Sequence, residues 1–320
     1  MAELLRLAGD DEADDGFASS VLSGLAATPK RLEAKYFYDA AGSALFERIC
    51  ELEEYYVTRA ELAILRQAAP EIADLIGPDA VVFEPGSGAG VKCRLLLDAL
   101  TRPAAFLPSD ISSAHLAAAT EALAADYPEV AVQALALDFT REFSLPLARR
   151  GDGAGVVFFP GSTVGNFEPE AARAFLDRLG RATGAGWLLI GVDLEKDERI
   201  LLPAYDDAAG VTAAFNLNLL TRINRDLGGN FDLAAFAHKV RYDRGCHRIE
   251  MHLESRQAQI VRVLDRRFGF AAGESIHTEN SYKYTVERFA RLAASAGWRA
   301  TRVWTGEAGL FSLHLMRRAR

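Results

Sequence analysis

The chain has few residues of the kinds that form crosslinks or bind metal ions. Its 320 residues include three cysteines, Cys50, Cys93 and Cys246, too few and too irregularly spaced for a disulfide framework or a zinc site. The six histidines show no ligand spacing along a helix face. We therefore expect free thiols, a reducing compartment and no bound metal.

Long apolar runs and basic runs are also absent. No apolar segment approaches the length of a membrane span, and the acidic N-terminus lacks the pattern of a signal peptide. The net charge is −8, and nucleic-acid-binding proteins usually carry a basic face. We expect a soluble cytoplasmic protein with no nucleic-acid or membrane partner. Half of the residues are hydrophobic, enough for one large domain or two lobes.

The most informative stretch combines a strand, a glycine-rich turn and the start of a helix. It reads Val81-Val82-Phe83-Glu84-Pro85-Gly86-Ser87-Gly88-Ala89-Gly90-Val91-Lys92. Phosphate-binding loops end in Gly-Lys-Ser/Thr or read G-x-G-x-x-G, and Glu84 would repel a pyrophosphate. A cationic or hydroxyl-rich ligand suits this position better. The pattern resembles the S-adenosylmethionine loop of Rossmann-like methyltransferases; a nicotinamide or flavin loop and a structural turn are the alternatives.

From residue 80 onward, the apolar pattern alternates between strand and helix, which is typical of an α/β fold. After the first strand, further strands are predicted at residues 105–110, 130–137, 155–159 and 186–193. The acids Glu84, Asp110 and Asp138 end the first three strands. Because the carboxyl ends of parallel strands line the ligand crevice of a doubly wound sheet, these acids predict a nucleoside site beside the glycine loop.

The alternation stops near residue 194. A long helix is predicted at residues 204–227, followed by antiparallel strands at 236–242, 248–253 and 259–264. Residues 285–296 return to helix, and strands at 299–305 and 310–316 complete the sheet. We interpret residues 196–284 as an α+β insertion in the sheet, on which residues 1–60 pack; residues 61–195 and 285–320 form the nucleoside-binding domain.

Two aromatic clusters lie close to the N-terminus, around Tyr38 and around Tyr55. They are interpreted either as a hydrophobic collar or as a lid of phenol groups over a pocket. Thr58 and Glu61 have the spacing of a capping box at the start of a helix. After the fourth strand, Asn166 ends a run of small residues, where it either binds a ligand or caps the helix that follows.

Several longer stretches resemble the histidine Nα-methyltransferases of the ergothioneine pathway. They are Lys35-Tyr36-Phe37-Tyr38-Asp39, Glu54-Tyr55-Tyr56-Val57-Thr58-Arg59, Gly161-Ser162-Thr163-Val164-Gly165-Asn166, Ala204-Tyr205-Asp206-Asp207-Ala208-Ala209-Gly210-Val211-Thr212, Arg248-Ile249-Glu250-Met251 and Thr278-Glu279-Asn280-Ser281. The resemblance covers almost the whole chain. It implies a Rossmann-like class I methyltransferase domain with an inserted α+β substrate-binding domain. The implied reaction is trimethylation of the α-amine of L-histidine to hercynine, through the mono- and dimethyl forms.

The resemblance also assigns residues to the cofactor, S-adenosyl-L-methionine. The positions are Glu84, Gly86, Gly88, Lys92, Asp110, Asp138 and Phe139. Lys92 is expected to face the cofactor's carboxylate and Asp110 its ribose hydroxyls, while Asp138 and Phe139 hold the adenine.

A second set of residues is assigned to the substrate. The positions are Tyr38, Tyr55, Gly161, Asn166, Tyr205, Met251, Glu279 and Ser281. Glu279 is expected to accept a hydrogen bond from one imidazole nitrogen and Ser281 to donate to the other. Tyr38 and Asn166 are the candidate catalytic residues, with Tyr38 near the amine. No obligate protein partner is inferred, and we expect a monomer.

The chain departs from the family pattern at Pro85 and Asn280. Strand alternation should point the side chain of Asn280 away from Glu279 and Ser281. Three other functions remain open at this point: a methyltransferase of the same fold that acts on another amino acid or small amine, a nicotinamide-dependent oxidoreductase, and a non-catalytic binding protein.

Overall fold

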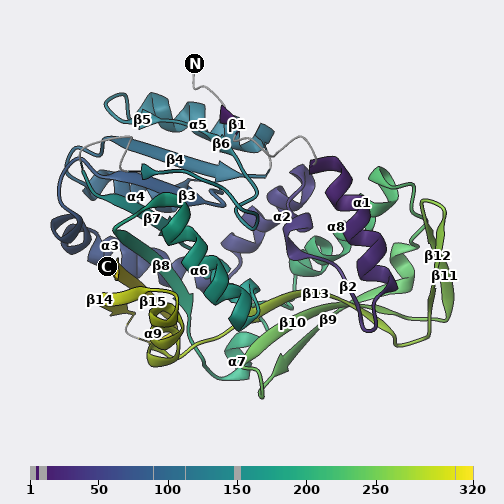
Figure 1. The fold of residues 1–320 in the computed structure, drawn as a ribbon. Coiled ribbons are helices and arrows are strands. Elements are labelled where there is room, and N and C mark those ends of the chain that lie inside the picture. Colours follow the sequence, from purple (N-terminus) through teal and green to yellow (C-terminus); the bar gives the residue numbers. More distant parts are fainter. Residues whose placement is uncertain are drawn as a thin grey trace. The chain divides into compact units, whose positions relative to one another are not determined.

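The computed structural model describes residues 5–6, 13–88, 90–111, 113–147, 153–306 and 308–319. The chain forms two compact units (Figure 1). The first, here called the Rossmann unit, comprises Met1–Asp10, Val57–Glu195 and Lys283–Arg320. The second, the insertion unit, comprises Asp11–Tyr56 and Lys196–Tyr282.

The described strands of the Rossmann unit form one sheet. They are β1 (Leu5–Arg6), β3 (Val81–Pro85), β4 (Ala105–Asp110), β5 (Ala131–Val132), β6 (Leu135–Ala136), β7 (Gly155–Phe159), β8 (Trp187–Asp193), β14 (Trp298–Thr305) and β15 (Phe311–Arg318). Their order is β1-β6-β4-β3-β7-β8-β15-β14, with β5 also paired to β4. Neighbours are parallel except that β15 runs antiparallel to β8 and β14. Because strand order reverses at β3, the ligand crevice is expected at its carboxyl end.

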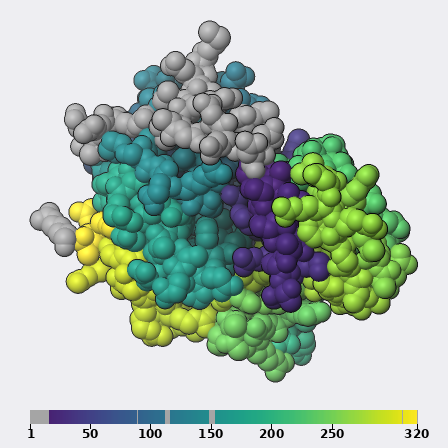
Figure 2. All heavy atoms as spheres, turned by 45° about the vertical axis from the view of Figure 1, so that its right-hand side comes forward, coloured from purple at the N-terminus to yellow at the C-terminus, as the bar shows by residue number. Residues whose placement is uncertain are grey.

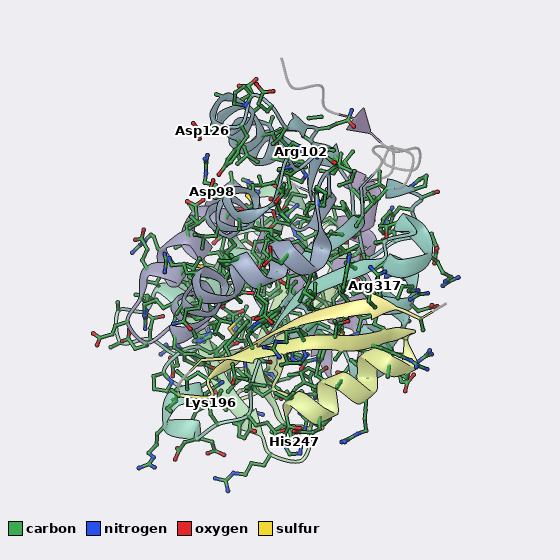
Figure 3. The ribbon with its side chains drawn as sticks, turned by 90° about the vertical axis from the view of Figure 1, so that its left-hand side faces the viewer. Asp98, Arg102, Asp126, Lys196, His247 and Arg317 are labelled. Carbon is green, nitrogen blue, oxygen red and sulfur yellow. The ribbon has the colours of Figure 1, made fainter. Side chains whose placement is uncertain are left out.

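Helices cover this sheet. They are α3 (Tyr56–Ile76), α4 (Val91–Ala99), α5 (Ser113–Asp126), α6 (Pro169–Thr183) and α9 (Val286–Ser295). The apolar side of α6 is buried through Phe175, Leu176 and Leu179, and α6 contacts both β7 and α9. Where β8 begins and the antiparallel β15 ends, the guanidinium of Arg317 (labelled in Figure 3) lies 4.2 Å from the ring centroid of Trp187. Strands β3 and β8 are buried along their whole length, which agrees with their mostly apolar sequences; the exceptions are the buried acids Glu84 and Asp193.

The insertion unit has a smaller sheet and its own helices. Its elements are α1 (Ala13–Ala26), β2 (Lys30–Arg31), α2 (Ala40–Glu51), α7 (Glu198–Leu201), α8 (Val211–Asp226), β9 (Phe236–Asp243), β10 (Arg248–Ser255), β11 (Gln259–Val263), β12 (Arg266–Phe270) and β13 (Ser275–Tyr282), with short 3-10 helices at Ala34–Phe37 and Leu233–Ala235. The sheet order is β2-β13-β10-β9, and β11 and β12 form a separate hairpin. Helix α8 packs against α2, β9 and β10. In Figure 2 the purple α1 lies beside the yellow-green hairpin, and it contacts β12.

The sequence predicts a single third strand at residues 130–137, and this prediction is wrong in one respect. The structure has two short strands there, β5 and β6. Both pair with β4, β5 at Ala105–Phe106 and β6 at Ser109–Asp110. The carbonyls of Phe106 and Asp110 accept from this neighbouring segment, so Pro108 faces the same side. Proline has no N–H to donate, and the ladder is interrupted opposite it.

The predicted helix at residues 204–227 is also wrong at its start. Helix α8 begins at Val211, after Gly210 with a φ of +71°. The carboxylate of Asp207 accepts hydrogen bonds from the amides of Val211, at 2.9 Å, and Thr212, at 2.7 Å. The alanine-rich segment before the helix has helical spacing, but this capped turn ends the periodicity.

The unit boundaries differ from the predicted ones at three places. Leu5–Arg6 pairs in parallel with β6 and so belongs to the Rossmann unit, although residues 1–60 were assigned to the other domain. Helix α3 begins at Tyr56, and the Rossmann unit takes the chain from Val57. Lys283 also belongs to the Rossmann unit, where its ammonium lies 2.7 Å from Asp193. These tertiary contacts decide boundaries that the local pattern leaves open.

Candidate active site

The glycine loop lies at the carboxyl end of β3. Gly86 has a φ of +70°, and a Cβ there would lie 3.1 Å from the ring of Phe139. At Gly88, no atom of the described residues other than its chain neighbours lies within 4 Å of the corresponding position. Gly90, with a φ of +75°, precedes the first residue of α4. The loop therefore requires glycine conformations and leaves space beside Gly88 for a ligand.

Glu84 is the buried acid that precedes this loop. Its carboxylate accepts a hydrogen bond from the hydroxyl of Ser87 at 2.8 Å. Burial raises the pKa of Glu84 to about 7, against the opposing effects of Ser87 and the Lys92 ammonium; the nearby Glu61 carboxylate adds to the increase. Near neutral pH this carboxyl group is therefore partly protonated, and a nearby cation would favour its ionised form.

The other two strand-end acids lie at the same edge of the sheet. Asp110 is the last residue of β4, and Asp138 follows shortly after β6. The two strands are paired in parallel with Asp110 opposite Ala136, so both acids lie at the carboxyl ends of neighbouring strands. Asp138 accepts a hydrogen bond from the amide of Thr140 at 2.9 Å. The ring centroid of Phe139 lies 5.9 Å from that of Phe159. Two half-buried carboxylates that can accept hydroxyl groups, an aromatic ring and an open glycine loop fit the adenosine and methionine parts of S-adenosylmethionine.

Lys92 has a partner that the sequence does not indicate. Its ammonium lies 2.6 Å from the carboxylate of Glu61 on α3. The amide of Gly161 donates to both oxygens of the same carboxylate, each at 2.9 Å. The capping-box prediction for Glu61 is wrong, because α3 begins at Tyr56 and places Glu61 beyond its first turn. No local signal identifies this role, since Glu61 and Gly161 are 100 positions apart and Lys92 lies on a separate helix.

The loop after β7 contains two consecutive residues with a left-handed backbone conformation. Gly161 has a φ of +80° and Ser162 a φ of +57°. The less usual conformation of Ser162 is stabilised by a hydrogen bond from the amide of Asp193 to its hydroxyl, at 2.9 Å. A 3-10 helix over Thr163–Asn166 follows. The N-cap of α6 is Glu168, so Asn166 does not cap this helix.

The remaining predicted substrate residues lie in the insertion unit. The hydroxyl groups of Tyr205 and Ser281 are hydrogen-bonded at 2.8 Å. The ring centroids of Tyr55 and Tyr205 are 6.2 Å apart. Burial raises the pKa of Tyr55 well above its usual value, and Tyr205, Tyr38 and Glu279 raise it further. Met251 is the cross-strand neighbour of Glu279. The structure thus brings together Tyr38, Tyr55, Tyr205, Met251, Glu279 and Ser281.

Strand β13 carries an irregularity immediately before Glu279. The register with β10 shifts between Met251 and His252, and the hydroxyl of Thr278 donates to the Met251 carbonyl at 3.0 Å. From Glu279 onward the pairing is regular, and Asn280 lies opposite Glu250. Asn280 therefore lies on the sheet face opposite to Glu279 and Ser281, in agreement with the alternation. The apolar pattern does not indicate β13, because its sequence is mostly polar.

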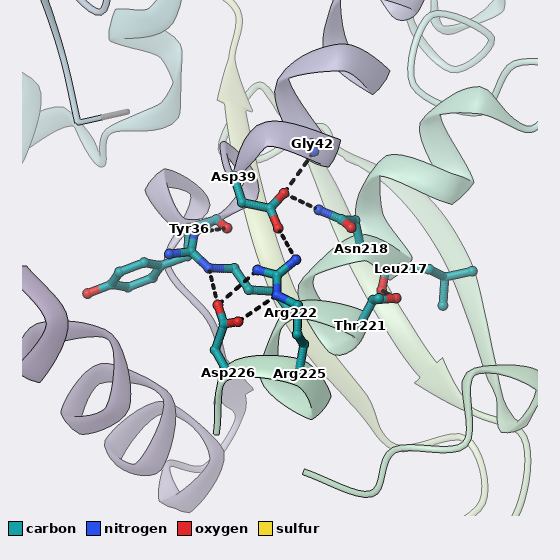
Figure 4. A network of polar contacts seen from close by, with 9 residues as sticks. All are labelled: Tyr36, Asp39, Gly42, Leu217, Asn218, Thr221, Arg222, Arg225 and Asp226. Atoms are coloured by element: carbon teal, nitrogen blue, oxygen red, sulfur yellow. Dashed lines mark hydrogen bonds and ion pairs between the residues drawn. The ribbon is translucent and has the colours of Figure 1, made fainter. Parts of the chain in front are cut away.

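A polar network anchors the residue that follows Tyr38 (Figure 4). The carboxylate of Asp39 accepts hydrogen bonds from the amide of Gly42 and the side-chain amide of Asn218, both at 2.8 Å. It also forms an ion pair with Arg225 at 2.9 Å. Although burial opposes it, these partners hold the pKa of Asp39 below its usual range. Asp39 thereby caps α2 and ties the Tyr38 backbone to α8.

The ring of Tyr38 itself is held by aromatic contacts. Its centroid lies 5.6 Å from that of Phe46 and 5.7 Å from that of Phe215, both edge to face. The neighbouring carbonyl of Tyr36 accepts a hydrogen bond from Arg222 at 2.9 Å, as Figure 4 shows. Tyr38 therefore has a defined position within the insertion unit.

The described residues show neither a membrane-spanning helix nor a metal-binding cluster. In the described ranges, no helix has the length and apolar character needed to cross a membrane. No group of three or more His, Cys, Asp or Glu side chains among these residues could hold a metal ion. Cys93 is buried, its Sγ lies 3.0 Å from the Gly90 carbonyl, and burial raises the pKa of its thiol. A buried, protonated thiol is unreactive, in agreement with a structural interpretation of Cys93.

The strand order, the antiparallel β15 and the glycine loop led by a buried acid define a Rossmann-like class I methyltransferase fold. The chain belongs to the family of histidine-specific, S-adenosylmethionine-dependent methyltransferases, which matches residues 17–318. The predicted enzyme class and cofactor are confirmed by this membership.

Two bacterial relatives are similar over nearly their full length. The histidine N-alpha-methyltransferase of Mycolicibacterium smegmatis is 44% identical, over 95% of this chain and 96% of the relative. That of Mycobacterium tuberculosis is 42% identical, over 96% of both chains. The ergothioneine biosynthesis protein 1 of Neurospora crassa is 30% identical over 91% of this chain, which corresponds to 34% of the longer fungal protein.

Proposed function

We propose that this protein trimethylates the α-amine of L-histidine to hercynine, as a step of ergothioneine biosynthesis. The observation that carries the proposal is the polar pair Glu279 and Ser281 on one face of β13. The hydroxyl group of Tyr205 is hydrogen-bonded to that of Ser281. This pair matches the two nitrogens of an imidazole ring. It occurs in a chain that belongs to the histidine-specific methyltransferases.

The proposed recognition of histidine depends on complementary hydrogen bonds. Glu279 accepts from one ring N–H. When the Tyr205 hydroxyl donates to Ser281, the Ser281 hydroxyl keeps its own proton for the other ring nitrogen. Phenylalanine or tryptophan would leave part of this pair unsatisfied, and buried polar groups without partners disfavour such analogues strongly. This requirement disfavours a methyltransferase of the same fold that acts on another aromatic amino acid.

The proposed chemistry needs a neutral amine, because an ammonium group has no lone pair. When bound, S-adenosylmethionine would supply an electrophilic methyl group on a positively charged sulfur; as the amine nitrogen gained the methyl group, the S–C bond would break and S-adenosylhomocysteine would leave. That charge lowers the pKa of an amine bound beside it, so little further acid–base catalysis is required. Tyr38 orients the amine or passes its proton to water, and Asn166 offers a donor and an acceptor to the amino-acid backbone. The small residues Gly161, Ser162 and Gly165 leave room for the added methyl groups.

In this proposal, the Rossmann unit binds the cofactor and the insertion unit binds the imidazole. The residues that would hold the cofactor are Glu84, Gly86, Gly88, Lys92, Asp110, Asp138 and Phe139. Lys92 would pair with the carboxylate of the methionine part, and Asp110 would accept from the ribose hydroxyls. We further propose that the protein acts as a cytoplasmic monomer without an obligate protein partner.

Mass spectrometry can test this function directly. The purified protein is incubated with S-adenosylmethionine and an equimolar mixture of the twenty amino acids. A gain of three methyl groups on histidine alone is the expected result. Methylation of another amino acid would refute the assigned imidazole pocket, and absence of any product would refute the proposed substrate. Glu279→Gln is the matched variant, and it should lower kcat/KM for histidine by about 10²-fold, because a neutral amide oxygen accepts the ring N–H more weakly than a carboxylate does.

A further inference from the structure

Glu61 is a buried carboxylate to which the proposed mechanism assigns no role. Its side chain is 1% exposed, whereas that of its partner Lys92 is 21% exposed. A buried carboxylate requires compensating partners, and Glu61 has the Lys92 ammonium at 2.6 Å and the Gly161 amide at 2.9 Å. The three groups therefore form one cluster, in which the carboxylate is buried and the lysine side chain is partly exposed.

The surrounding backbone is shaped to admit this carboxylate. A Cβ at Gly191 would lie 2.0 Å from the Glu61 carboxylate, and a Cβ at Gly161 would lie 3.4 Å from the Lys92 ammonium. A side chain at Gly191 would therefore displace the Glu61 carboxylate, whereas the distance at Gly161 is an ordinary contact. Gly191 belongs to β8 and leaves the space that the Glu61 carboxylate of α3 fills, while the turn after the neighbouring strand β7 donates the Gly161 amide to it.

The partners of Glu61 come from the two segments that border the expected ligand crevice. Lys92 lies in the first turn of α4, directly after the glycine loop of β3. Gly161 lies in the turn after β7, which is paired with β3. An ammonium group has three N–H donors, so Lys92 can bond to Glu61 and still present donors to a ligand carboxylate.

We propose that Glu61 is a positioning residue for the methyl transfer: its carboxylate fixes the Lys92 ammonium and the Gly161 turn relative to each other. The inference rests on the proposed function, because it takes Lys92 as a contact of the cofactor and Gly161 as a contact of the substrate. Glu61 touches neither ligand in this proposal. It acts by holding the glycine-loop helix and the turn after β7 in one arrangement.

The experiment compares Glu61→Gln with Glu71→Gln, a control on the same helix. Glu71 is 43% exposed and forms an ion pair with Arg302 away from the cluster. The readout is the dissociation constant of S-adenosylhomocysteine, measured by calorimetry, together with the thermal midpoint and kcat/KM for histidine. Glu61→Gln should weaken binding about tenfold and lower kcat/KM, since a hydrogen-bonded charge partner is lost. Glu71→Gln should match the wild type in binding and activity.

A double-mutant cycle with Lys92→Met tests whether Glu61 acts through Lys92. If it does, Lys92→Met should weaken cofactor binding much less in the Glu61→Gln background than in the wild type. Additive effects, or a lowered thermal midpoint with unchanged binding, would show a purely structural role and overturn the proposal. Tighter binding in Glu61→Gln would also overturn it, because Glu61 would then compete for Lys92.

The measurements on the wild type and on Glu61→Gln distinguish a failure of the proposed function from a failure of the inference on Glu61. If the wild-type protein binds no S-adenosylhomocysteine and methylates no histidine, the proposed function fails irrespective of Glu61. If the wild type does both and Glu61→Gln behaves like it, only the inference on Glu61 fails. Glu61→Asp is a second variant that keeps the charge but is one methylene shorter; it should fall between Glu61→Gln and the wild type.

Discussion

Glu84→Gln should stabilise the ligand-free protein above neutral pH. The pKa of Glu84 is raised from 4.5 to about 7 by burial, so between these values the folded state holds a proton that the unfolded state has released. Stability contributed by this group is therefore lost as the pH rises from about 4.5 to about 7. At about 1.4 kcal/mol per tenfold change in proton affinity, burial of the ionised carboxylate costs about 3 kcal/mol above pH 7. A glutamine is neutral at every pH and avoids this penalty.

The assay is urea denaturation of the wild type and Glu84→Gln at pH 5 and pH 8. The variant should gain about 2 kcal/mol relative to the wild type between the two pH values, because the carboxylate penalty is small at pH 5 and fully developed at pH 8. All other titrating groups are common to both proteins and cancel in this difference. Glu71→Gln, on the exposed part of α3, is the control and should show no such change. A difference that does not depend on pH would refute the assignment of the raised pKa to Glu84.

Further predictions concern the buried ion pair and the region around Tyr38. Lys283→Met should lower the free energy of unfolding by about 3–5 kcal/mol in chemical denaturation, because it leaves the fully buried Asp193 without its cation; adding Asp193→Leu should recover part of this loss. Tyr38→Phe should lower kcat more than it raises KM for histidine in steady-state assays, and an unchanged kcat would remove the proposed role of its hydroxyl. Asp39→Ala should reduce stability by about 1–2 kcal/mol in urea denaturation, because the cap of α2 at Gly42 is lost; a change below the error of the measurement would contradict the capping role.

Local patterns predict the parts of the Rossmann sheet that are buried on both faces. The strands at 105–110 and 155–159 have the bounds that the sequence predicts, because each contains a short apolar run, Ala105–Leu107 and Val156–Phe159, bounded by turn residues. The prediction fails where packing overrides periodicity. The alanine-rich segment before Val211 has helical spacing, yet the Asp207 carboxylate caps the chain there and starts α8 later.

The apolar pattern also fails to identify strands whose sequences are mostly polar. Strand β13 carries both Glu279 and Ser281, but its sequence lacks the apolar alternation by which a strand is identified. Its pairing with β10 on one side and β2 on the other makes it a strand. Local propensity does not indicate a strand here, and only the resemblance to the histidine Nα-methyltransferases points to Glu279 and Ser281.

The sequence alone determines the glycine loop, the acids that follow neighbouring strands and the position of the insertion, because each depends on residues adjacent in the chain. Only the tertiary structure brings Glu61 to Lys92 and Gly161, and Tyr205 to Ser281. These partners are separated by tens of residues, so no local spacing encodes them. The raised pKa of Glu84 also depends on the tertiary structure. The sequence places a glutamate at this position, but only the fold buries it and removes water from its carboxyl group.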